Sequence, residues 1–71
     1  MATLVMAPMV GKILNLVAQV GNQVEEGETI LVMEAMKMEI DVVAPASGTL
    51  QEINVAPGDS VNPRRVLAVI A

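Results

Sequence analysis

The sequence contains no Phe, Tyr or Trp, no Cys and no His. Without cysteine the fold has no disulfide and no thiolate metal site. Without histidine it lacks the commonest general base and the commonest metal ligand. The missing aromatics and a formal net charge of −4 argue against nucleic-acid binding, which normally requires a basic surface and stacking platforms. The chain is therefore poorly equipped for catalysis of its own, and we expect no nucleic-acid partner.

Long hydrophobic runs are also missing, since every apolar run is far shorter than the roughly 20 residues that span a bilayer. The first residues lack the positively charged region of a signal peptide. We therefore expect no direct membrane insertion and a location in the cytoplasm or an organellar matrix. With 71 residues, 54% of them hydrophobic, the chain can form one compact domain over residues 1–71.

Short apolar runs separated by Gly and Pro predict an all-β sandwich or barrel. No window of helical length keeps a 3.6-residue period without an interrupting Gly or Pro. The expected extended segments are 2–6, 10–18, 29–34, 38–43, 49–55, 60–62 and 66–70. Residues 20–22 are expected to form a turn, and 24–28 a short charged connection.

The chain repeats itself without a gap when it is shifted by 37 residues. The shift matches Ala7-Pro8 with Ala44-Pro45, Gly11 with Gly48, Gly21 with Gly58, Val24 with Val61 and Val32 with Val69. The matched Pro and Gly residues fall at predicted turns. One such unit cannot bury its own apolar face, so we expect two units packed about a pseudo-twofold axis. The segment 35–41 that joins them is expected at one end of the molecule, with Lys37 at its outermost point.

The join itself predicts a hairpin that turns at Met36-Lys37, between the apolar runs 29–33 and 40–43. Two-residue hairpin turns need positive φ at both central residues and usually contain Asn-Gly or Asp-Gly. Met and Lys are poor choices for such a turn. A local rule that is broken at a tip, in a chain that obeys such rules elsewhere, marks a functional site.

Strand alternation divides the hairpin pairs between two faces. The expected core side holds the pairs Ala35–Met38, Met33–Ile40 and Leu31–Val42, and the other side holds Glu34–Glu39, Val32–Asp41 and Ile30–Val43. Two carboxylates that face each other cost a few tenths of a kcal/mol, so stability alone does not select Glu34 and Glu39. An acidic collar below a cationic tip indicates recognition by a partner. The plain alternative makes Lys37 an ordinary surface charge and Met38 a core filler.

Glu34-Ala35-Met36-Lys37-Met38 resembles the attachment motif of biotinyl domains, in which a lysine between two methionines receives biotin through an amide bond. Residues 7–11, 20–27, 44–48 and 57–61 resemble further segments of the same family, so the resemblance covers essentially the whole chain. It implies a flattened barrel of two four-stranded antiparallel sheets and a covalent biotin on Lys37. It also implies recognition roles for Glu34, Ala35, Met36, Met38 and Glu39.

The function that the resemblance implies is that of a biotin carboxyl carrier rather than an enzyme. A biotin protein ligase would acylate Lys37, and the carrier would then move carboxyl groups from a biotin carboxylase to a carboxyltransferase or decarboxylase. The lysine must lose a proton before it attacks, and we expect the ligase to provide that activation. One departure from the family pattern is Pro63-Arg64-Arg65, where an acidic residue and a glycine are common. We expect this turn to lie far from Lys37.

Two other readings use the same fold. A lipoyl carrier domain also presents a lysine at this tip, but its motif usually has Asp before the lysine and Ala after it. A non-catalytic, lipoyl-like adaptor normally has a long insertion where this chain has Met36-Lys37.

Overall fold

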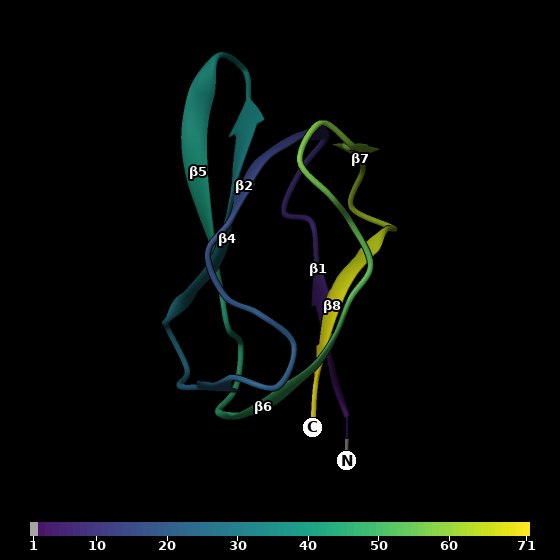
Figure 1. Ribbon diagram of the computed structural model, residues 1–71. Coiled ribbons are helices and arrows are strands. Elements are labelled where there is room, and N and C mark those ends of the chain that lie inside the picture. The colour runs from purple at the N-terminus through teal and green to yellow at the C-terminus, as the bar shows by residue number, and fades with distance from the viewer. Residues whose placement is uncertain (1) are drawn as a thin grey trace.

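Residues 2–71, the part of the chain that the computed structural model describes, form two four-stranded antiparallel sheets with no helix. The strands are β1 (Thr3–Met6), β2 (Gly11–Leu16), β3 (Gln23–Val24), β4 (Thr29–Ala35), β5 (Met38–Val43), β6 (Gly48–Ile53), β7 (Ser60–Val61) and β8 (Val66–Ile70). One sheet has the order β1-β8-β6-β3 and the other the order β5-β4-β2-β7 (Figure 1). The predicted fold class is confirmed.

The internal repeat is a structural one. A shift of 37 residues carries β1 onto β5, β2 onto β6, β3 onto β7 and β4 onto β8, and it converts one strand order into the other. The hydrogen bonds that extend the β3–β6 and β2–β7 pairings obey the same shift. The Gly21 N–H donates to the Leu50 carbonyl at 2.8 Å, and the Gly58 N–H donates to the Ile13 carbonyl at 2.8 Å. Each sheet takes strands from both halves, so neither half can form its sheet alone.

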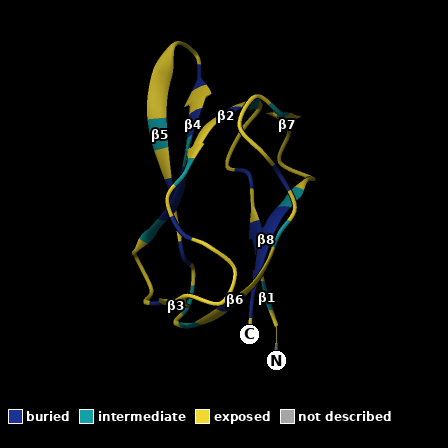
Figure 2. Cartoon of the chain, in the orientation of Figure 1, coloured by how far each residue is buried: buried dark blue, intermediate teal, exposed yellow. Residues whose placement is uncertain are grey.

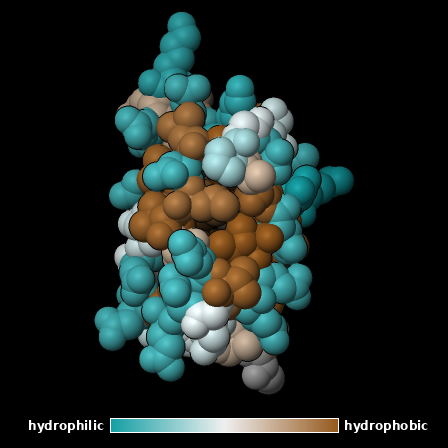
Figure 3. Space-filling model, in the orientation of Figure 1, coloured by the Kyte–Doolittle hydropathy of each residue, from teal (hydrophilic) through white to brown (hydrophobic). Residues whose placement is uncertain are grey.

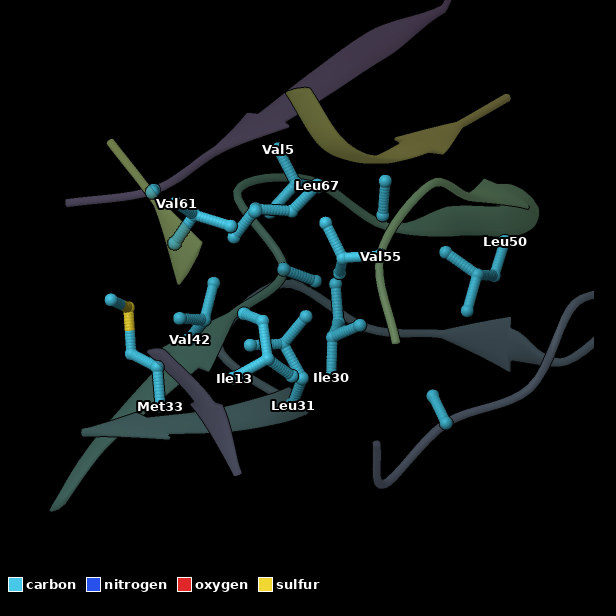
Figure 4. Close-up of a cluster of buried hydrophobic side chains, with 14 of the residues drawn as sticks. Val5, Ile13, Ile30, Leu31, Met33, Val42, Leu50, Val55, Val61 and Leu67 are labelled. Atoms are coloured by element: carbon cyan, nitrogen blue, oxygen red, sulfur yellow. The ribbon is translucent and has the colours of Figure 1, made fainter. Parts of the chain in front are cut away.

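The core lies between the two sheets and consists of aliphatic side chains and one methionine. Its largest fully buried side chains are Ile13, Ile30, Leu31, Met33, Leu50, Leu67 and Ile70. The labelled side chains of this cluster point toward one another from both sheets, and Met33 lies toward one end (Figure 4). Within the described residues no polar or charged side chain is buried, so apolar burial is the main source of stability.

Strand β3 differs from the expectation that this part of the chain is only a turn and a connection. Gln23 and Val24 pair with Thr49 and Gly48 of β6, and Val24 is buried. Two residues are too short for a strand pattern to be recognised from sequence periodicity. The expected strands at 10–18 and 49–55 are also shorter in the structure, where they end at Leu16 and Ile53.

The molecule is elongated, with principal extents of 32 × 19 × 17 Å. The β4–β5 hairpin projects at one pole, and β1 begins and β8 ends toward the other (Figure 1). Over residues 2–71, no helix has the length and apolar character needed to cross a membrane.

Candidate functional site

The hairpin turn consists of Met36 and Lys37, as predicted. β4 ends at Ala35 and β5 begins at Met38, and these two residues face each other. Met36 has a φ of 52° and Lys37 a φ of 63°. Among residues 2–71 they are the only non-glycine residues with positive φ. A non-glycine residue in this region costs about 1 kcal/mol or more, so the backbone strain of the domain is concentrated at the lysine.

The strand register below the turn follows the prediction over five pairs. Ala35–Met38, Glu34–Glu39, Met33–Ile40, Val32–Asp41 and Leu31–Val42 are all opposite each other.

The expected Ile30–Val43 pair is wrong, because Thr29 lies opposite Val43 and a bulge separates Thr29 from Leu31. A bulge places an extra residue in one strand. Here it turns Ile30 inward, where its side chain is fully buried.

Met38 does not lie in the core, although strand alternation predicted an inward face. Its exposed fraction is 66%, and that of Met36 is 85%. The hairpin extends past the second sheet, so the inward side of Met38 has no sheet opposite it; the tip is exposed in Figure 2. Lys37 is exposed as well, and a hydrophilic side chain projects from this pole in the space-filling view (Figure 3). Ala35, by contrast, is buried.

Gly11 at the start of β2 allows close packing against the base of the hairpin. A Cβ atom at this position would meet the Glu34 carbonyl oxygen and would lie 2.6 Å from Met33 Cε and 3.2 Å from Ala35 Cβ. Only glycine allows β2 to approach β4 this closely. The lower part of the hairpin is therefore packed tightly against the barrel, while its tip is free.

Three charged side chains form a row across the sheet below the turn. Lys12 of β2 lies opposite Glu34, and Glu34 lies opposite Glu39. All three are exposed, so the attraction or repulsion between neighbouring charges contributes little to stability. Sequence reasoning missed Lys12, because its place beside Glu34 depends on the register between two strands that are distant in the chain. The 37-residue repeat could have suggested a neighbouring strand but not this register.

The arrangement is suited to presentation rather than to catalysis. No group of three or more His, Cys, Asp or Glu residues that could hold a metal ion occurs in the described part of the chain. What the tip offers is one accessible primary amine on a strained, defined turn. Covalent attachment through an amide needs an accessible amine, and the exposed Lys37 fits that requirement. Fold and site together define a carrier type of domain, with one exposed lysine at the end of a projecting hairpin.

Comparison with known proteins identifies the family. The family described as "Biotin-requiring enzyme" matches residues 3–70. The chain is 43% identical over 65 residues to a biotin carboxyl carrier protein of Streptococcus mutans, which covers 92% of this chain and 50% of that protein. It is 35% identical over 71 residues to a Mycobacterium leprae protein described as a biotinylated protein TB7.3 homolog, with both chains fully covered. The crystal structure of Kluyveromyces lactis urea carboxylase contains a similar unit, with a TM-score of 0.95, 37% identity and coverage of 100% of this chain and 6% of that one.

The chain belongs to this family of biotin-requiring proteins, and it is a biotin carrier domain. It spans half the length of the Streptococcus relative and a small part of the urea carboxylase chain.

Proposed function

We propose that Lys37 is the residue that carries biotin, and that residues 1–71 act as one biotinyl domain of a biotin-dependent carboxylase or decarboxylase. The observation that supports this assignment is the exposed lysine on the Met36-Lys37 turn, where the strained backbone and the projecting hairpin coincide. When attached, biotin accepts a carboxyl group at one enzyme site and releases it at another.

Attachment requires the Lys37 ammonium group to lose a proton and its Nζ to attack the acyl carbon of biotinyl adenylate. The amide bond forms as the bond to AMP breaks. The sequence contains no histidine to act as a general base, so we assign the group that accepts the proton to the biotin protein ligase. The product has one positive charge fewer than the unmodified domain, whose formal net charge is −4.

The residues around Lys37 divide into those that touch a partner and those that support the turn. Met36 and Met38 present exposed thioethers on both sides of the amine. Methionine side chains are flexible and polarisable, so they can adapt to several different enzyme surfaces. Glu34 and Glu39 offer carboxylates to basic groups of the ligase, and the buried Ala35 keeps the top of β4 packed.

The proposed partners are a biotin carboxylase and a carboxyltransferase or decarboxylase, in the same polypeptide or in separate subunits. The similar unit within urea carboxylase supports an arrangement in which the carrier is tethered to its enzymes. Tethering raises the local concentration of the carried group without tight binding. We place this activity in the cytoplasm or an organellar matrix.

Co-expression with a biotin protein ligase, followed by streptavidin blotting, intact mass and peptide mapping, tests the proposal. We expect a single biotinyl group on Lys37, none in the Lys37→Arg variant, and normal attachment in the matched control Lys12→Arg. Biotin on the Lys37→Arg variant would mean that another lysine is the acceptor. Modification by a lipoate ligase in place of the biotin enzyme would instead support a lipoyl carrier.

A further inference from the structure

A groove runs between β1 and β5, the free edge strands of the two sheets, and has a volume of about 380 Å³. Its lining residues are Leu4, Val5, Met6 and Pro8 on one side and Asp41, Val42, Val43 and Pro45 on the other. The second set is the first set shifted by 37 residues, so the groove lies on the pseudo-twofold axis. It is part of the body of the barrel and does not include Lys37.

The groove has a buried apolar floor and exposed apolar rims. Val5 and Val42 belong to the core and are 3% and 5% exposed. Leu4, Met6 and Val43 line the same groove and are 53%, 38% and 44% exposed. The exposed parts of Leu4, Met6 and Val43 can be buried further only if another molecule enters the groove, and such burial would be favourable.

The backbone on both sides of the groove is available for pairing. Within residues 2–71, β1 pairs only with β8 and β5 only with β4, so each has one free edge. A free edge presents unpaired N–H and C=O groups that accept an added strand. β1 has four residues, so a segment of about four residues, at roughly 3.3 Å each, spans it.

Asp41 breaks the symmetry of the groove. The position equivalent to Leu4 is Asp41, and it is the one charged residue among the described residues that line the groove. Asp41 is exposed and lies opposite Val32 of β4. A carboxylate on one rim of an otherwise apolar groove favours a segment with one basic side chain on that rim.

We propose that this groove binds an extended, apolar segment of a partner protein that carries one lysine or arginine, through strand addition to the free edge of β1 or β5 with the basic side chain on Asp41. So short a segment binds weakly, with a dissociation constant on the order of 1 mM. Within a tethered carboxylase, local concentrations of the same order make such contacts effective. The site would hold the body of the carrier against an enzyme while the hairpin remains free.

Titration of the isotope-labelled, unbiotinylated domain with the capped peptide acetyl-Thr-Val-Lys-Val-Thr-amide, followed by NMR, tests the proposal independently of biotin attachment. We expect shift changes confined to residues 4–6 and 41–43, together with slower amide exchange along β1 or β5. Asp41→Asn should weaken binding about threefold, as the loss of an exposed ion pair does, and should remove most of its salt dependence. The matched control Glu52→Gln removes an exposed carboxylate outside the groove and should bind like the parent; circular dichroism verifies that both variants fold.

Three results would overturn the proposal. The first is the absence of shift changes at millimolar peptide, and the second is shift changes located away from β1 and β5. The third is concentration-dependent self-association through the same residues without peptide, detected by sedimentation, which would make a second copy of the domain the occupant. Equal weakening by Asp41→Asn and Glu52→Gln would overturn the role of Asp41.

Discussion

Glu34 and Glu39 lie directly opposite each other in the β4–β5 ladder, immediately below the turn that presents Lys37, and both are exposed. Facing carboxylates repel each other by a few tenths of a kcal/mol. On the other side of Glu34, Lys12 is its register partner in β2. Because Glu39 is exposed and faces another carboxylate, we propose that its charge serves recognition.

The variant Glu39→Gln tests this interpretation. We expect the free energy of unfolding to rise by about 0.3 kcal/mol, because the repulsion is removed, and biotin attachment to slow. Chemical denaturation and single-turnover ligation measure the two effects. Glu52→Gln is the control, since Glu52 is exposed and lies opposite Val69 rather than another carboxylate. An unchanged ligation rate for Glu39→Gln would contradict a recognition role for the acidic collar, that is, the carboxylates of Glu34 and Glu39.

The variant Met36→Leu should slow ligation or carboxyl transfer without changing the stability of the domain. The side chain of Met36 is 85% exposed, so its replacement removes almost no packing and should leave the melting temperature nearly unchanged. Ligation or carboxyl transfer should become slower, because the flexible thioether is lost. Unaltered rates in both steps would contradict a recognition role for Met36.

Met36→Asn should stabilise the domain. Asparagine tolerates the left-handed conformation better than other side chains that have a Cβ atom, and residue 36 has a φ of 52°. We expect a gain of about 0.5–1 kcal/mol in the free energy of unfolding, measured by denaturant titration. A loss of stability would mean that Met36 makes contacts that its exposure does not indicate.

Mild peroxide should oxidise Met36 and Met38 before Met33. Each sulfur takes one oxygen atom from peroxide and releases water, and the reaction follows exposure. Met33 is fully buried, whereas the two tip methionines are the most exposed of those described. Peptide mapping should find sulfoxide at residues 36 and 38 together with slower ligation. The double variant Met36→Leu/Met38→Leu should lose no further ligation rate on peroxide treatment; a further loss would locate the sensitive group elsewhere.

Gly11→Ala should destabilise the base of the hairpin. The added Cβ would meet the Glu34 carbonyl oxygen and Met33 Cε, and overpacking of this kind costs about 1–3 kcal/mol. Denaturation measures the cost, and ligation reports whether the displaced hairpin still presents Lys37. Wild-type stability in this variant would show that β2 and β4 can separate at little cost.

The parts of the fold that depend on local pattern could be predicted from the sequence, whereas those that depend on long-range register could not. The 37-residue repeat gave the two related halves, and the strand lengths on either side of Met36-Lys37 gave the turn. Ile30 was placed on the wrong face because a bulge shifts the alternation by one residue. Met38 was expected inside because alternation does not reveal where the opposite sheet ends.

The same dependence on long-range strand register applies to two groups of basic residues. Lys12 lies beside Glu34 only because β2 and β4 pair in one particular register. The distance of the Pro63-Arg64-Arg65 turn from Lys37 stays a prediction; the turn follows β7, which pairs with the start of β2. Arg65 is used locally, since its Nη2 donates to the Asn54 carbonyl at 2.9 Å.

β1 begins and β8 ends at the pole away from the hairpin (Figure 1). A polypeptide joined at that pole would therefore act as a pivot at the end of the domain opposite Lys37. The whole 32 Å length of the barrel then lies between pivot and amine. A rotation at the pivot would move the amine along an arc whose radius is set by this length. The length of the domain, and not only the flexible side chain of Lys37 with its biotin, would thus determine how far the carried carboxyl group can reach.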